Sequence, residues 1–211
     1  DHVVEMEFRS RSSDTYPQSI ADEHDCVFRQ TGGVDLGDES LEYVAVAGAA
    51  PETVLDDLLD HELVVDGRII RTDDDGGVLE LRALASYQSM LLDLGVRTVD
   101  IVADGDTVTI TIEAPADADP RTVQETLAEH ASGFELVAKQ ECDRRPTTRT
   151  DSSSLREELT DRQREILRAA YLAGYYEWPR DTNAEQLADT LDIASSTLHQ
   201  HLRRAERNLL H

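Results

Sequence analysis

The last helical stretch of the sequence, residues 195–209, carries hydrogen-bonding and basic side chains at the spacing of one helix face. Its apolar residues Leu198, Leu202, Ala205 and Leu209 recur at steps of four, three and four, so they form the buried side. Amide, hydroxyl and guanidinium groups on the opposite side are those that proteins use to bind DNA bases and phosphates. The predicted DNA-contacting residues are Ser195, Ser196, Thr197, His199, Gln200, Arg203, Arg204 and Arg207.

These side chains divide by chemistry into base readers and phosphate binders. Gln200 can make two hydrogen bonds to adenine, and Arg203 can make two to guanine, both in the major groove. Hydroxyl and guanidinium groups at the flanking positions are better suited to phosphate oxygens. The predicted phosphate contacts are Ser195, Thr197, Arg204 and Arg207.

Two helices must position the one that carries these residues. Thr160 begins the capping box TDRQ that Gln163 closes, and Gly174 is expected to stop this first helix. Thr182 begins a second capping box, TNAE, that Glu185 closes. The pattern predicts three consecutive helices at the end of the chain.

The connection between the last two helices predicts a steep crossing. Only Asp192-Ile193-Ala194 joins them, and the small Ala188 permits their close approach. Asp192 stands where such turns often have glycine, and aspartate tolerates a left-handed backbone; Ser195 can cap the last helix. This is a helix-turn-helix, whose second helix enters the major groove. The alternative is a plain three-helix bundle with a solvated face, but two capping boxes, a small pivot and a basic face together favour DNA binding.

An aromatic loop, YYEWPRD, joins the first two of these helices. A ligand cage of Tyr175, Tyr176 and Trp178 is one interpretation. Packing of these rings against the helical domain is the favoured one, because Pro179 ends any helix there.

The acidic charge is concentrated outside the helical part. The whole chain has a net charge of -24, from 44 acidic and 20 basic residues. Residues 155–211 contain 8 arginines and 10 acidic residues, so residues 1–154 hold 12 basic and 34 acidic groups. The polar stretch 144–154 contains Pro146 and no apolar residue, which is typical of a linker. The predicted organisation is a first domain over 1–143, a linker over 144–154 and a helical domain over 155–211.

The first domain is predicted to be α+β. Strand patterns occupy 3–8, 27–32, 41–48, 78–84 and 134–141, and helix patterns occupy 51–63, 85–95 and 119–133. Two hairpins are expected, with turns at Asp66-Gly67 and Asp104-Gly105. Helices interleaved with antiparallel pairs favour an antiparallel sheet covered by helices, of ferredoxin-like or related type.

No catalytic or cofactor motif is present. GxSxG, Walker A and GxGxxG patterns are all missing, so an enzyme is not expected and no cofactor is predicted. His24 and Cys26 give weak metal-site spacing, and His199 and His201 point in different directions on one helix, so no metal is predicted. The acidic run 73–77 is interpreted as a solvated turn, because it lacks the spacing and the final glutamate of a calcium loop.

The composition favours a halophile's cytoplasm. Lys139 is the single lysine against 19 arginines, and molar salt, with a Debye length of about 3 Å, would nearly extinguish the acidic repulsion. An ordinary acidic protein is the alternative. No apolar run predicts a membrane span, and the first residues, DHVVEMEF, are not a signal peptide; they are expected to be the cut edge of a longer protein.

The helical part also resembles a known family. The pieces LTDRQ, AAYLAGYYEWPR, LADTLDI and HLRRAERNLL are similar to the C-terminal helix-turn-helix of the haloarchaeal bacterio-opsin activator (Bat) family. The preceding block, opening with VVEMEF, resembles the family's associated domain more loosely. The resemblance implies a sequence-specific transcription regulator, with double-stranded DNA as its partner and sensor domains upstream in many relatives.

A homodimer is expected, since one helix-turn-helix reads only a few base pairs. The apolar end Leu209-Leu210 or an edge of the N-terminal sheet could form the contact; the alternative is that both leucines complete the intrachain core. The N-terminal domain is expected to couple a signal or a partner to DNA binding. A competing hypothesis is a non-catalytic ligand-sensing or protein-interaction module whose helical tail contacts transcription machinery.

Overall fold

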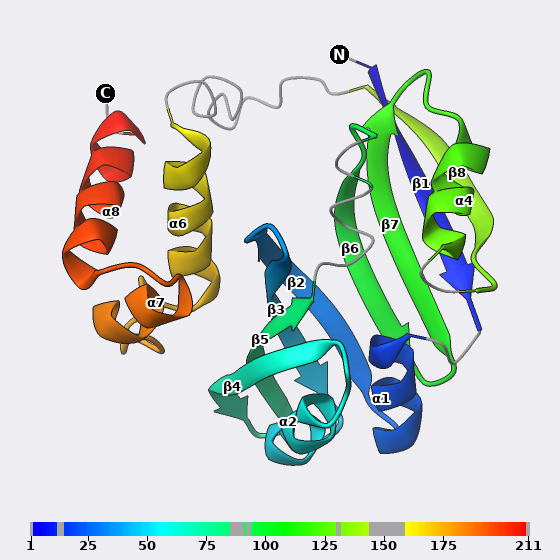
Figure 1. Ribbon diagram of the computed structural model, residues 1–211. Helices are drawn as coiled ribbons and strands as arrows, with labels where there is room; N and C mark the ends of the chain where they lie inside the picture. Colours follow the sequence, from blue (N-terminus) through cyan, green and yellow to red (C-terminus); the bar gives the residue numbers. More distant parts are fainter. Residues whose placement is uncertain are drawn as a thin grey trace. The chain divides into compact units, whose positions relative to one another are not determined.

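The computed structural model describes residues 2–11, 15–84, 91, 94–129, 132–143 and 159–209. The chain divides into two compact units, Asp1–Arg144 and Arg145–His211, and each is described here by itself (Figure 1). The expected linker and most of the helix predicted over 85–95 lie outside the described residues.

Unit 1 contains one antiparallel sheet of eight strands, in the order β4-β5-β3-β2-β6-β7-β1-β8. The strands are β1 (His2–Ser10), β2 (Val27–Asp35), β3 (Glu39–Ala47), β4 (Val64–Asp73), β5 (Gly76–Leu84), β6 (Arg97–Asp104), β7 (Thr107–Pro115) and β8 (Glu135–Asp143). The described helices of the unit are α1 (Tyr16–His24), α2 (Pro51–Leu59) and α4 (Pro120–Ala128). The predicted α+β class is confirmed.

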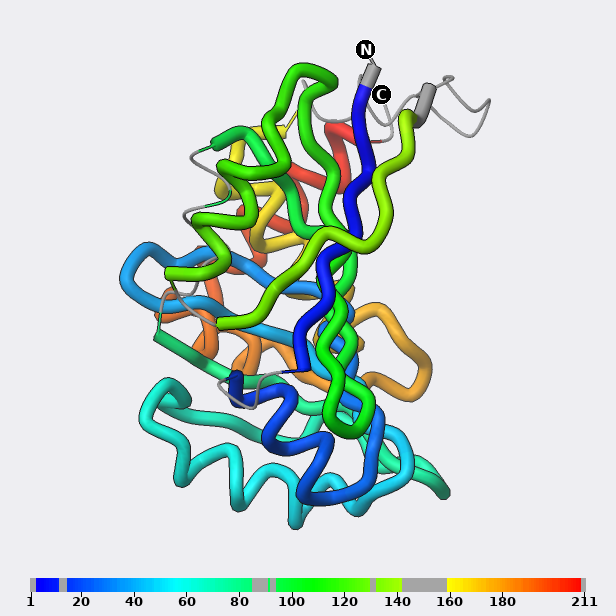
Figure 2. The backbone as a smooth tube through the Cα atoms, turned by 90° about the vertical axis from the view of Figure 1, so that its right-hand side faces the viewer, coloured from blue at the N-terminus to red at the C-terminus, as the bar shows by residue number. Residues whose placement is uncertain are grey.

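The helices cover one face of this sheet. Alternate strand residues, such as Met6 and Phe8 of β1 and Ile110 and Ile112 of β7, point into a single apolar core. Helices α1, α2 and α4 complete that core with residues that include Ile20, Val54, Leu58, Val123 and Leu127. In the tube view, α4 runs beside β1 and the edge strand β8 (Figure 2).

The two halves of the sheet differ in topology. The half β8-β1-β7-β6 has the strand order of a ferredoxin-like fold, in which α1 and α4 belong to two interleaved βαβ units. Residues 27–84 extend the sheet by four further strands, which join the first half through β2 and β6. That joint has only four paired residues, Val27–Gln30 against Asp104–Ile101. The ferredoxin-like prediction therefore describes half of the sheet.

The turn predicted at Asp66-Gly67 is wrong. Both residues lie within β4, and the turn of the β4–β5 hairpin is Asp74-Asp75, with Asp73 paired to Gly76. Gly67 is small for a different reason: an added Cβ would lie 2.9 Å from a methyl group of Leu55 in α2. The glycine lets a helix approach the strand closely, and the acidic run is the turn, as expected.

Other elements differ less from expectation. The second predicted hairpin is present, but its turn is Gly105-Asp106, one residue later. Helix α2 ends at Leu59, four residues before the predicted end. Helix α1 was not predicted: Ile20 and Ala21 are its buried apolar residues besides Pro17, so the sequence shows little helical periodicity.

A buried carboxylate lies between α1 and the sheet. Glu42 of β3 is 2% exposed and accepts hydrogen bonds from the Tyr16 hydroxyl and from the Ser40 hydroxyl at 3.0 Å. Burial raises the pKa of Glu42, and the two hydrogen bonds oppose that rise. The folded chain therefore holds a proton on Glu42 at a pH where the unfolded chain has lost it.

We expect this carboxylate to make unit 1 less stable as pH rises. Because the folded pKa is raised, the stability present at acid pH is lost as pH increases through that pKa. Glu42→Gln removes this titration, so the variant should gain stability relative to wild type as pH rises above the unfolded carboxyl pKa of about 4.3. Urea unfolding at constant KCl measures the difference, with the exposed Glu62→Gln as control. A difference that stays constant or reverses with pH would contradict the assignment.

Candidate nucleic-acid interface

Unit 2 is built from three described helices, α6 (Asp161–Leu172), α7 (Ala184–Thr190) and α8 (Ser195–Leu209). Each helix contributes residues to one core, among them Ile166 and Ala170, Leu187 and Ala188, and Leu198, Leu202 and Ala205. The apolar side predicted for α8 is therefore buried, except that Leu209 is only partly covered. Ala188, the predicted pivot, is 1% exposed.

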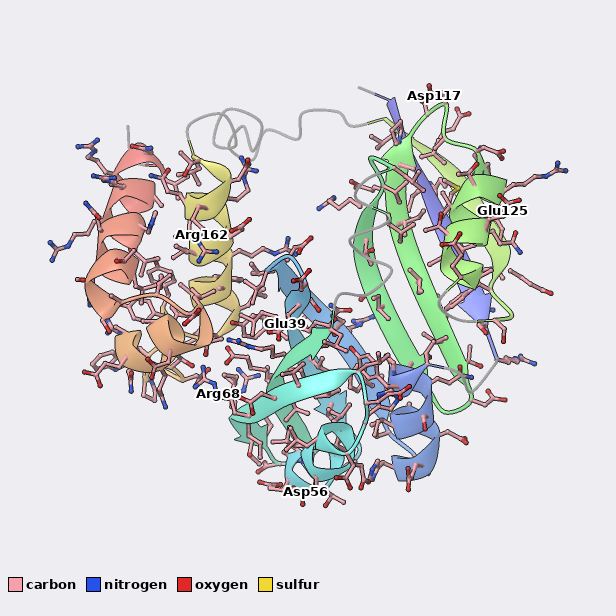
Figure 3. The ribbon with its side chains drawn as sticks, in the orientation of Figure 1. Glu39, Asp56, Arg68, Asp117, Glu125 and Arg162 are labelled. Carbon is pink, nitrogen blue, oxygen red and sulfur yellow. The ribbon has the colours of Figure 1, made fainter. Side chains whose placement is uncertain are left out.

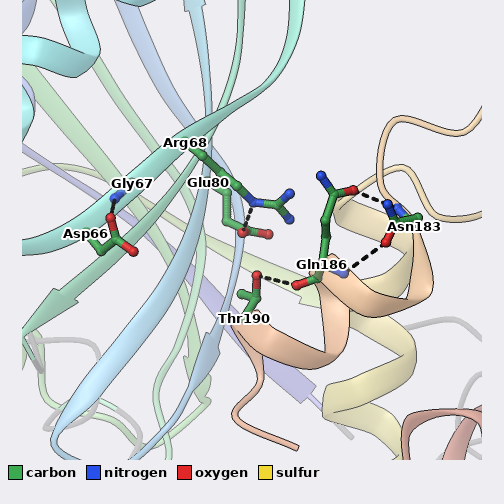
Figure 4. A network of polar contacts seen from close by, with 7 residues as sticks. All are labelled: Asp66, Gly67, Arg68, Glu80, Asn183, Gln186 and Thr190. Atoms are coloured by element: carbon green, nitrogen blue, oxygen red, sulfur yellow. Dashed lines mark hydrogen bonds and ion pairs between the residues drawn. The ribbon is translucent and has the colours of Figure 1, made fainter. Parts of the chain in front are cut away.

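The first predicted capping box is present, and the second is displaced by one residue. Thr160 and Gln163 cap α6 reciprocally. For α7 the cap is Asn183, whose side chain accepts from the backbone of Glu185 and Gln186, while the Gln186 side chain reaches back to Asn183 at 3.1 Å (Figure 4). Thr182 is 1% exposed, so its side chain lies in the interior, and the pair Thr182–Glu185 is not the cap.

The C-terminal ends of α6 and α7 have the same backbone conformation. At the end of α6, Gly174 has φ +69°, and the amide of Tyr175 donates to the carbonyl of Ala170 at 2.9 Å. At the end of α7, Asp192 has φ +51°, and the amide of Ile193 donates to the carbonyl of Ala188 at 3.0 Å. Both are Schellman ends, with a left-handed residue that turns the chain. The left-handed Asp192 predicted from the sequence is confirmed.

A side chain of α6 also holds the end of α7. Arg162 donates to the backbone carbonyl of Leu191 at 3.5 Å and pairs with Glu165 at 3.3 Å (Figure 3). Carbonyl groups at a helix end lack intrahelical partners, so a cationic donor there is favourable. Sequence reasoning did not find this contact, because nothing in the local pattern shows which helix end Arg162 meets.

The side of α8 opposite the core is polar and exposed. Helix α8 begins at Ser195, so this serine is the first helical residue instead of the cap. Of the predicted contact residues, Ser195 and Thr197 are partly covered, and the other six are exposed. Four residues at steps of four, three and four form the centre of this side, here called the outer strip: Ser196, Gln200, Arg203 and Arg207. Thr197 and Arg204 flank the strip on one side, and Ser195 and His199 on the other.

The basic residues of α8 have no acidic partners among the described residues. Arg203, Arg204 and Arg207 make no ion pair there, whereas Arg164 of α6 pairs with Asp161 at 3.0 Å. The single acidic residue of α8, Glu206, accepts a hydrogen bond from the Tyr176 hydroxyl at 2.8 Å. Unpaired guanidinium groups on a helix face are available to phosphates and base edges.

The aromatic loop is only partly packed. Tyr175 is 8% exposed, with the Arg180 guanidinium 4.6 Å from its ring centre. Burial, helped by the neighbouring Glu206, raises the pKa of Tyr176, which keeps its hydroxyl a donor to that carboxylate. Trp178 is 94% exposed, so the prediction that all three rings pack against the helical domain is wrong for this residue.

Within the described residues, one group of side chains has metal-ligand spacing. Ligand atoms of Glu23, His24 and Asp57 lie within 4.8 Å of one another. His24 Nε2 is 2.7 Å from Asp57 Oδ2, so this contact ties α1 to α2 without an ion. Cys26, which the sequence placed near His24, is buried and is not part of the group. No described helix is long and apolar enough to cross a membrane.

Fold and site together define a helix-turn-helix DNA-binding protein. Residues 159–211 match the model described as HTH_10, an HTH DNA-binding domain. Residues 1–154 match the BAT model, described as the GAF and HTH_10 associated domain. The chain therefore belongs to the BAT family, the bacterio-opsin activator family that its helical motifs resemble.

Named relatives are haloarchaeal. A putative transcriptional regulator of Haloferax volcanii is 34% identical over 213 residues, which cover 100% of this chain and 36% of the relative. The bacterioopsin transcriptional activator of Halobacterium salinarum is 32% identical over 207 residues, covering 84% of this chain and 31% of the relative. The transcriptional regulator NarO of Haloferax volcanii is 51% identical over 55 residues, 26% of each chain. The chain thus spans about a third of the length of the first two relatives.

The left-handed turn gives a stability prediction. Valine at position 192 would place a β-branched side chain at φ +51°, which costs roughly 1–2 kcal/mol or more. Glycine or asparagine there should change stability by less than ~1 kcal/mol, since both tolerate this backbone. Unfolding followed by circular dichroism measures the series. The matched control, Asp189→Val at an exposed position of α7, should cost less than ~0.5 kcal/mol, because valine and aspartate have similar helix propensities. Equal costs for both valine variants would contradict the account.

Proposed function

We propose that the protein is a sequence-specific DNA-binding transcription regulator whose helix α8 lies in the major groove. The observation that carries the proposal is the outer strip. Its side chains are exposed, its arginines make no ion pair with the described acidic residues, and it lies on the second helix of a helix-turn-helix. In this motif the N-terminal half of the second helix contacts base edges. Gln200 and Arg203 are then the base readers, because their side chains can make bidentate hydrogen bonds to adenine and to guanine.

Phosphate contacts come from residues around the strip. Arg204 and Thr197 lie on one flank, Ser195 lies near the start of the helix, and Arg207 continues the strip toward its end. These groups fix the helix on the backbone without reading sequence. Ser196 and His199 are exposed beside the base readers and complete the proposed contact surface.

Salt limits how much of the affinity these phosphate contacts supply. Each phosphate contact releases counterions, so affinity falls steeply with salt concentration. The acidic side chains of unit 1, such as Asp56, Asp117 and Glu125 in Figure 3, are exposed and would repel DNA at low salt. In molar salt that repulsion is screened within about 3 Å, and base contacts and avidity must supply most of the affinity.

Avidity follows if the protein binds as a homodimer. Two helix-turn-helix units reach half-sites separated by about 34–36 Å along the duplex. Linking two modest contacts multiplies affinity without any new interaction. Dimerisation of the chain is therefore part of this proposal.

Unit 1 is proposed to couple a signal or a protein partner to DNA binding, without catalysis. Among the described carboxyl groups of unit 1, Glu42 has a raised pKa, and it accepts hydrogen bonds from Tyr16 and Ser40 of the same unit, so it is not presented to a substrate. A family domain described as associated with GAF and HTH_10 domains supports a connecting role. The alternative, a protein-binding helical tail, draws on the exposed Trp178, because aromatic anchors dominate protein interfaces.

Arginine variants separate base reading from phosphate binding. Arg203→Ala should lose roughly 1–3 kcal/mol of discrimination between the preferred and unrelated sites. Arg207→Ala should weaken binding to all sequences and reduce the slope of log affinity against log salt by about 1. The measurement is a KCl-titrated binding assay with genomic upstream fragments. Arg121→Ala, which removes an exposed arginine from α4 of unit 1, is the control and should change neither quantity.

The contrary outcome is equally clear. If the wild-type chain shows no preference for any fragment in molar KCl, base reading by α8 is refuted. If Arg203→Ala and Arg121→Ala behave alike while preference persists, the sequence is read by other residues.

A further inference from the structure

Strand β8 forms one end of the sheet and has an open edge. It follows β1 at the end of the strand order, so none of the described strands pairs with its outer side. Every side chain from Glu135 to Glu141 is exposed, including Leu136 at 38% and Val137 at 45%. An edge strand presents unpaired amide and carbonyl groups, which another strand can complete.

The second part of β8 is regular enough to be such a template. Against β1 the register shifts between Leu136 and Ala138, which leaves Val137 as a bulge. From Ala138 to Asp143 the pairing continues without interruption. Bulges bend a strand locally, so a regular partner strand fits 138–143 and not the stretch before it.

The charged residues of this regular part share one face. Lys139 pairs with Met6 and Glu141 with Val4, and both β1 residues point into the helix-covered core. Gln140 pairs with Glu5 and therefore lies on the opposite face. Residues two apart on a strand point to the same side, so Lys139 and Glu141 are fixed on the helix side.

Resting on the dimer in the proposed function, we infer that β8 pairs antiparallel with β8 of a second copy, with Gln140 on the twofold axis. In that register Lys139 of each copy lies directly opposite Glu141 of the other. Directly opposite residues have Cβ atoms about 4.5–5.5 Å apart, within reach of an ion pair. The dimer then has two such pairs, related by symmetry, and the sheet becomes continuous across both copies.

Moving the twofold axis along β8 from Gln140 gives registers with like charges opposite each other or with side chains of different faces opposite each other. An axis on Lys139 places two lysines opposite each other, and an axis on Glu141 places two glutamates opposite each other. An axis between residues pairs side chains of different faces, which the pleat forbids. An axis on Gln140 places each side chain opposite one on the same face of the sheet, and it also places opposite charges together. The lysine involved is the only one in the chain.

This position of the axis also suits two DNA half-sites. Residue 143 is three residues from the axis, so the two copies of it lie about 20 Å apart at roughly 3.3 Å per residue. Fifteen residues, 144–158, precede the described helical unit, and such a length can span up to about 50 Å. The two helix-turn-helix units can therefore reach half-sites about 34 Å apart.

The opposite edge of the sheet is a poorer template. Strand β4 has two register shifts against β5, at Val64–Asp66 and at Ile69–Arg71, so its regular stretches are short. Its exposed Thr72 provides a control position on that edge.

Charge exchange tests the register directly. At the lowest KCl concentration at which the full chain stays folded, Lys139→Glu and Glu141→Lys should each weaken dimerisation on the order of tenfold, because each converts both attractive pairs into repulsive ones. The double exchange Lys139→Glu with Glu141→Lys has the wild-type composition and should restore the dimer. Sedimentation equilibrium measures all four chains. Single variants without effect, or a double variant no better than the singles, would overturn the register.

Cross-linking tests the axis independently of charge. Gln140→Cys, in a Cys142→Ser background, should form a disulfide between copies, since directly opposite residues have Cα separations within the range of disulfides. Thr72→Cys in the same background should stay reduced. Cross-linking at position 72 but not at 140 would place the interface on β4 and overturn the proposal.

The two proposals can fail separately. If the single charge-exchange variants dimerise as wild type does and still bind DNA specifically, the β8 interface is wrong and the DNA-binding function stands. Efficient cross-linking at position 140, with no sequence preference for DNA, would keep the interface and remove the proposed regulator.

Discussion

The direction of helix α8 depends on one residue in a left-handed conformation, Asp192. Asp192 ends α7 in a Schellman motif, and the chain enters α8 three residues later. The buried Ala188 lets the two helices approach at that corner, and Arg162 of α6 holds the last carbonyl of α7. The outer strip of α8 is exposed because these contacts turn its apolar side into the core. In the proposed function, a different angle at this corner would direct Gln200 and Arg203 away from the major groove.

The acidic composition and DNA binding are compatible because charge is distributed unevenly. Most of the net charge of -24 belongs to residues 1–154, whereas α8 has three arginines and one glutamate. The glutamate, on the flank of the helix that also carries His199, accepts a hydrogen bond from the Tyr176 hydroxyl at 2.8 Å. Phosphate contacts contribute less to affinity in concentrated salt. The proposed function therefore relies on short-range base contacts and on the proposed pairing of two copies.

The sequence predicted the elements whose signals are local and failed where tertiary packing decides. The amphipathic pattern of α8, the Thr160 cap and the turn at Asp192 all depend on nearby residues, and all three are present. In TNAEQ two overlapping caps compete, and burial of Thr182 leaves the role to Asn183. Gly67 resembled a turn residue but provides space for Leu55 of α2, a contact from twelve residues away. Exposure of Trp178 likewise depends on what surrounds the loop, which no local pattern contains.

Selection of binding sites from a random DNA pool, in molar KCl, tests the central claim most directly. The wild-type chain should enrich one sequence, and Arg203→Ala and Gln200→Ala should each lose preference at a single, different base position within it. Arg204→Ala should enrich the wild-type sequence with lower yield, because a phosphate contact carries no base information. If all four chains enrich the same sequence with equal preference at every position, α8 does not read the bases.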